Sequence, residues 1–127
     1  MKLVAHEAET EALTEWLRGR PLRITSLLSK VELMRAARRV AVTADDPTVT
    51  ARAAAVLTTL AIASLSDATA ERAGVVDPPT LRSLDAVHLA TALLAGPLEA
   101  FVAYDQRLAD AARAAGISVV QPGRENV

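Results

Sequence analysis

Short apolar stretches with strand character alternate with helical patterns along most of this 127-residue chain. We expect strands over residues 22–25, 61–65, 100–104 and 118–120, and helices over residues 5–18, 27–40, 47–60, 67–75, 83–95 and 106–115. Strands that alternate with helices are joined by right-handed crossovers and run parallel. The sequence therefore predicts an α/β fold in which helices cover both faces of a parallel sheet.

Residues with capping preferences mark several of the expected helix ends. Ser26, Ser83 and Asp105 stand where the first turn of a helix needs a side-chain oxygen to accept a backbone N–H. Gly116 stands where a helix can end in left-handed geometry. The run Asp77-Pro78-Pro79 predicts a loop, because proline disfavours helical geometry in the residue before it.

The size and composition of the chain limit its domain organisation and its partners. No linker, repeat or low-complexity tract interrupts the sequence, so we expect one domain over residues 1–127. With only Trp16, Phe101 and Tyr104 as aromatic residues, the chain lacks a platform on which unpaired bases could stack. The formal net charge of −1 gives no overall positive field. Any nucleic acid would therefore be bound through its phosphates.

Several classes of protein are excluded by what the sequence lacks. It contains no cysteine, which rules out disulfides and thiolate metal sites. It has no signal-peptide pattern and no apolar run near the roughly 20 residues of a membrane helix, so we expect a cytoplasmic protein without a membrane partner. Its few glycines form neither a dinucleotide fingerprint nor a phosphate-binding loop.

Three acidic residues occupy positions that an α/β chain of this order can bring together. Glu32 lies in mid-helix between apolar neighbours, Asp85 lies in the first turn of a helix, and Asp105 follows the expected strand over 100–104. The carboxyl ends of parallel strands form the functional crevice of such sheets. Three carboxylates would repel one another there unless a divalent cation lay between them, so the sequence suggests metal-dependent chemistry.

Each of these acidic residues also has a purely structural explanation. Asp105 suits a helix N-cap, and Asp85 is favoured by the helix dipole and could pair with Arg82. Glu32 could pair with Arg35 or Arg39 on its own helix. If these roles were the whole explanation, the chain would be a soluble α/β domain whose three carboxylates lie far apart.

Four segments resemble motifs of the PIN-domain ribonuclease toxins of the VapC type. In chain order they are Ile24-Thr25-Ser26 followed by Val31-Glu32-Leu33, residues 81–92 (LRSLDAVHLATA), residues 101–108 (FVAYDQRL), and Gly116 with Val119, Val120, Pro122 and Gly123. The resemblance covers nearly all of the chain, in order and at the spacing of the family. The segment 81–92 is the most specific of the four.

This resemblance implies a three-layer αβα sandwich with a central parallel sheet. It also implies an endoribonuclease that depends on Mg²⁺ or Mn²⁺, is held inactive by a VapB-type antitoxin and forms a homodimer. Glu32, Asp85 and Asp105 match the second, third and fourth of the four acidic positions in the family. The resemblance therefore implies that these three residues bind the metal and are catalytic.

The chain departs from the family at its N-terminus. The first family motif is a central strand that ends in an aspartate, followed by a Lys-Leu pair that aligns with Lys2-Leu3. The first strand and the first acidic position are therefore missing, and we expect that the recorded start is too late and that Met1 stands where the family commonly has valine. The alternative function is a catalytically impaired, truncated PIN domain that only binds its antitoxin.

Overall fold

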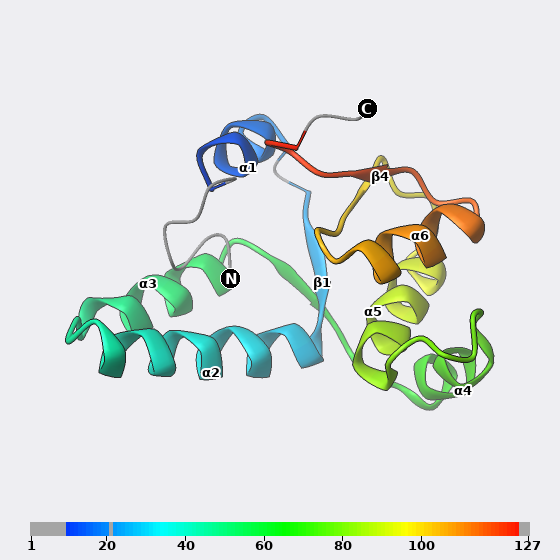
Figure 1. Ribbon diagram of the computed structural model, residues 1–127, viewed down its shortest axis with the longest axis horizontal. Coiled ribbons are helices and arrows are strands. Elements are labelled where there is room, and N and C mark those ends of the chain that lie inside the picture. The colour runs from blue at the N-terminus through cyan, green and yellow to red at the C-terminus, as the bar shows by residue number, and fades with distance from the viewer. Residues whose placement is uncertain (1–9, 21, 125–127) are drawn as a thin grey trace. The chain divides into compact units, whose positions relative to one another are not determined.

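The computed structural model describes residues 10–20 and 22–124, which form helices and short strands (Figure 1). The elements are α1 (Thr10–Leu17), β1 (Ile24–Ser26), α2 (Leu27–Thr43), α3 (Thr48–Leu57), β2 (Ala61–Ala63), α4 (Asp67–Val75), α5 (Ser83–Leu94), β3 (Phe101–Val102), α6 (Gln106–Ala114) and β4 (Val119–Val120). The described part of the chain divides into two compact units. One is formed by the described residues up to Ile62 together with residues 122–124, and the other by residues 63–121.

The order of helices and strands agrees with the α/β alternation that the sequence predicts. The first part of the expected helix over 5–18, and the Lys2-Leu3 pair, lie outside the described residues. Ser26 caps α2 as predicted, because its side chain accepts from the Ser29 N–H at 3.3 Å. The prediction that Ser83 is an N-cap is wrong. Arg82 has the extended backbone of the cap position, and Ser83 is the first helical residue.

The strands are shorter than predicted and form two two-stranded sheets, β1 with β2 and β3 with β4. β3 and β4 are parallel, with Phe101 opposite Val119 and the Phe101 N–H donating to the Ser118 carbonyl at 2.8 Å. These pairs confirm an α/β architecture with a small parallel sheet. The single central sheet of a three-layer sandwich stays a prediction.

The core of the first unit lies between α2 and α3. It is built from Leu33, Ala37, Val49, Ala53 and Leu57. These side chains recur every four residues on each helix, which places them on one face. Ala37 and Ala53 have no exposed surface, so the two helices approach each other closely there. α2 and α3 lie side by side in Figure 1.

The core of the second unit lies among α5, α6 and the β3–β4 pair. Its buried residues are Leu89, Ala103, Leu108, Ala109, Ala111 and Ala112. α6 ends at Ala114, and Gly116 just beyond it has a φ of 88°, the left-handed geometry expected from the sequence. α4 packs on α5 in the same unit. In the parts of the chain that the structure describes, no helix has the length and apolarity needed to cross a membrane.

Candidate active site

Asp85 is held in the first turn of α5 and points its carboxylate at Arg82. The Nε of Arg82 donates to Oδ2 of Asp85 at 3.1 Å. Only 13% of the Asp85 side chain is exposed, whereas 66% of the Arg82 side chain is exposed. The flanking apolar sequence predicts a desolvated carboxylate that needs a partner. The structure confirms that Arg82 is such a partner.

Asp105 follows β3 and caps α6, as the sequence predicts. Its Oδ1 accepts from the Leu108 N–H at 3.0 Å, which satisfies one of the free amides at the start of the helix. Its Oδ2 lies 3.5 Å from Nη2 of Arg82. The two carboxylate oxygens therefore serve different partners. The capping role of Asp105 leaves its second oxygen available to a cation.

Arg82 brings the two aspartates together around one positive charge. Its guanidinium forms ion pairs with Oδ2 of Asp85 and with Oδ2 of Asp105. The shared arginine shows that both carboxylates can face the same cation. Carboxylate oxygens are also the ligands that Mg²⁺ and Mn²⁺ prefer. The pair of aspartates therefore fits part of a divalent-cation site.

Glu32 lies in α2, in the first unit, whereas Asp85 and Asp105 lie in the second. Its side chain is half-buried beside Leu33, which is 4% exposed. Within either unit, the residues that the structure describes contain no group of three His, Asp or Glu side chains placed to hold a metal ion. The structure thus brings two of the three predicted ligands together, and the grouping of Glu32 with them stays a prediction.

The sequence did not reveal the contact between Arg82 and Asp105. Arg82 is three residues before Asp85, so their pairing across the start of a helix could be expected from spacing alone. Asp105 follows a different strand, and its distance from Arg82 depends on how α5 and α6 pack. The only available signal was the placement of Asp105 at the carboxyl end of a strand.

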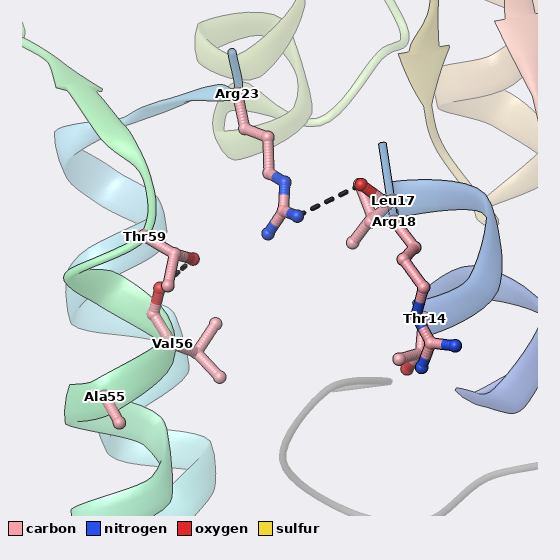
Figure 2. A pocket seen from close by; sticks show the side chains of 7 residues that line it. All are labelled: Thr14, Leu17, Arg18, Arg23, Ala55, Val56 and Thr59. Atoms are coloured by element: carbon pink, nitrogen blue, oxygen red, sulfur yellow. Dashed lines mark hydrogen bonds between the residues drawn. The ribbon is translucent and has the colours of Figure 1, made fainter. Parts of the chain in front are cut away.

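A separate open cavity of about 390 Å³ lies in the first unit, between α1 and α3 (Figure 2). It is lined by Thr14, Leu17, Arg18, Arg23, Ala55, Val56 and Thr59. Arg23 extends into it and donates from Nη2 to the Leu17 carbonyl at 3.0 Å, at the C-terminal end of α1. The described residues that line the cavity include no carboxylate or histidine. The described walls of the cavity combine apolar side chains with the two arginines Arg18 and Arg23.

Comparisons with known proteins find relatives of similar length that are named ribonucleases. The family model described as PIN domain matches residues 1–114. Ribonuclease VapC35 of Mycobacterium tuberculosis is 43% identical over 98% of this chain and 92% of its own length. Ribonucleases VapC47 and VapC46 of the same species are 39% and 37% identical, over 96% of this chain and 90% and 91% of their own lengths. No solved structure gives a significant match. Because the PIN-domain model matches residues 1–114, the chain belongs to the PIN-domain family.

Proposed function

We propose that this protein is a metal-dependent endoribonuclease, which hydrolyses RNA phosphodiester bonds and acts as the toxin of a toxin–antitoxin pair. The observation that carries the proposal is the near-full-length likeness to three proteins named ribonucleases. The convergence of Asp85 and Asp105 on one guanidinium supports it, because it gives the chain a pair of carboxylates with a shared cationic partner.

Glu32, Asp85 and Asp105 are the residues that would hold Mg²⁺ or Mn²⁺. A divalent cation bound to carboxylates polarises a phosphodiester and lowers the pKa of an attacking water. Asp85 supplies a largely buried carboxylate fixed in a helical turn, and Asp105 supplies the oxygen that its capping bond leaves available. In the hydrolysis, a water oxygen forms a new bond to phosphorus, one P–O ester bond breaks, and the leaving oxygen gains a proton.

We also propose that the two compact units belong to a single PIN domain, since the family model extends over both. The proposed partner is a VapB-type antitoxin, and the cavity between α1 and α3 offers apolar walls and two arginines to an acidic, apolar segment of it. We further propose that the protein is cytoplasmic and forms a homodimer. Each subunit would have the three-layer αβα sandwich of the family.

A second candidate function is antitoxin binding without catalysis. It is favoured by one observation: Arg82 already pairs with both aspartates. In that case the protein would sequester its antitoxin and leave RNA intact.

RNA cleavage by the purified protein in Mg²⁺ or Mn²⁺ distinguishes these functions. We expect cleavage that EDTA abolishes and that Asp85→Asn lowers by at least roughly 100-fold, because the variant removes a ligand charge. Asp110→Asn is the matched control, since Asp110 is an exposed residue of α6 paired with Arg113, and it should leave cleavage unchanged. Cleavage that persists in EDTA would contradict the metal-dependent mechanism. Antitoxin binding without cleavage, even in excess Mn²⁺, would establish the second function instead.

A further inference from the structure

The two aspartates and Arg82 differ in how firmly the chain holds them. Asp85 is fixed in the first turn of α5 and its side chain is only 13% exposed. Asp105 is fixed by its bond to the Leu108 N–H. Arg82 lies on extended backbone just before α5, and two thirds of its side chain faces solvent. The guanidinium can therefore turn into water without opening the core. The Asp85 carboxylate is largely buried, and Asp105, although 44% exposed, is tied to the start of α6 by its capping bond.

A divalent cation and the Arg82 guanidinium would compete for the same oxygens. Oδ2 of Asp85 and Oδ2 of Asp105 both face Arg82. Two positive groups within about 4 Å of each other repel, so a metal held by these oxygens favours departure of the guanidinium. Before a metal binds, the same guanidinium offsets the repulsion between the two carboxylates.

We propose that Arg82 is an internal counter-cation, which holds Asp85 and Asp105 together until a divalent cation displaces it. This inference rests on the proposed function, because it assumes that both aspartates bind the metal. Arg82 thereby acts as a positioning residue: it sets the metal affinity of the site and keeps the two carboxylates close together while no metal is bound.

The displacement has a measurable consequence for metal affinity. To bind, the metal must break the ion pairs of a mostly exposed arginine. The free-energy cost is small and weakens metal binding by roughly two- to ten-fold. Removing Arg82 removes this cost and the repulsion from its charge. The Arg82→Gln variant should therefore bind Mn²⁺ about two- to ten-fold more tightly than the wild type.

Mn²⁺ titration followed by electron paramagnetic resonance tests the proposal without any measurement of RNA cleavage. We compare the wild type with Arg82→Gln and Arg82→Lys. Lysine keeps the charge but loses the planar fork that spans two carboxylates. The Mn²⁺ affinity of Arg82→Lys should therefore lie between those of the wild type and Arg82→Gln. Arg113→Gln is the matched control, because Arg113 also pairs with an aspartate three residues away in the same unit, and its affinity should equal that of the wild type.

A second readout is thermal unfolding without metal and with saturating Mn²⁺. We expect Arg82→Gln to lower the melting temperature without metal, since the two carboxylates then lack their counter-charge. The difference from the wild type should disappear when Mn²⁺ is bound. A lysine variant that melts like the wild type under both conditions would agree with a role based on charge.

The outcomes separate this inference from the proposed function. If Mn²⁺ binding is lost in Asp85→Asn but is equal or weaker in Arg82→Gln, the counter-cation role is overturned and the metal site stands. If Mn²⁺ binding is absent from the wild type, or persists unchanged in Asp85→Asn, the metal site itself is wrong and both proposals fail. Tighter binding in Arg82→Gln that requires Asp85 supports both.

Discussion

Asp85 and Asp105 share the guanidinium of Arg82, although Asp85 lies within α5 and Asp105 lies between β3 and α6. Two carboxylates that face the same point would repel each other if no cation lay between them. Their convergence therefore involves more than a helix cap at Asp105 and a favourable charge in the first helical turn at Asp85. It gives the second unit a local arrangement that can exchange one positive charge for another.

The two roles of Asp105 can be separated by Asp105→Asn. Asparagine is as good an N-cap as aspartate, so its side-chain oxygen should still accept from the Leu108 N–H. We expect the free energy of unfolding to change by less than about 1 kcal/mol, whereas cleavage should fall by at least roughly 100-fold because a ligand charge is lost. Chemical denaturation and an RNA cleavage assay measure the two effects. Full activity in this variant would remove Asp105 from the site.

Glu32→Gln tests whether the first unit contributes to the same site. The change preserves the size of a half-buried side chain and removes its charge. If Glu32 is the third metal ligand, Mn²⁺ binding and cleavage should both fall sharply while the fold is retained. Glu71→Gln, an exposed position on α4, is the control and should behave like the wild type. A Glu32→Gln protein with normal Mn²⁺ affinity would leave Asp85 and Asp105 as the only ligands among the three.

Leu89→Ala should destabilise the second unit strongly. Leu89 is 1% exposed and belongs to the core that includes Leu108 and Ala112. Truncating such a leucine removes apolar burial and leaves a cavity, which costs about 2–5 kcal/mol. Leu94→Ala lies on the same helix at a position that is 45% exposed, and its cost should be much smaller. Urea unfolding of both variants, followed by circular dichroism, measures the difference. Equal losses would show that burial does not determine stability here.

The pKa of Asp46 should respond more to Thr48 than to Arg52. The side-chain hydrogen bond from Thr48 is the largest cause that lowers this pKa from its ordinary value of 3.8, followed by the Thr48 backbone N–H, and Arg52 contributes least. The hydroxyl of Thr48 donates to Oδ1 of Asp46 at 2.6 Å and its N–H donates at 3.0 Å. We therefore expect Thr48→Val to raise the pKa toward 3.8 more than Arg52→Gln does, as measured by NMR titration.

The same shift fixes the direction of a pH dependence. Because folding lowers the pKa of Asp46, its contribution to stability is present above the unfolded value near 3.8 and is lost as the pH falls through the folded value. The destabilisation caused by Thr48→Val should accordingly be largest near neutral pH and should shrink in acid. If Thr48→Val lowered the free energy of unfolding by the same amount at pH 7 and pH 2, this linkage would be contradicted.

The elements that the sequence predicted well are those determined by local residues. The helix over Asp67–Val75 has the predicted bounds, and Asp105 caps α6 as expected, because capping depends on a few neighbouring backbone groups. The cap of α5 was misplaced because serine is a preferred cap by type, whereas the backbone of Arg82, at φ −62° and ψ 147°, holds that position. Strand lengths were overestimated, since strand pairing depends on distant partners.

The candidate site could be predicted only in part, because only some of its contacts are determined by local residues. The pairing of Arg82 with Asp85 follows from their spacing, whereas the contact of Arg82 with Asp105 depends on tertiary packing that no local pattern encodes. The three-residue set was suggested by the chain order and the positions of the carboxylates, and the family resemblance then implied that these residues bind the metal. Its membership beyond Asp85 and Asp105 therefore needs the Glu32 experiment.

The close approach of α2 and α3 limits which amino-acid substitutions this helix pair can tolerate. Ala37 and Ala53 have no exposed surface, so a larger side chain at either position would push the helices apart. Acceptable replacements there are confined to glycine or serine, unless a neighbouring leucine shrinks at the same time. Substitutions in this helix pair should therefore accumulate as volume-compensating pairs, whereas exposed positions such as Val42 change singly.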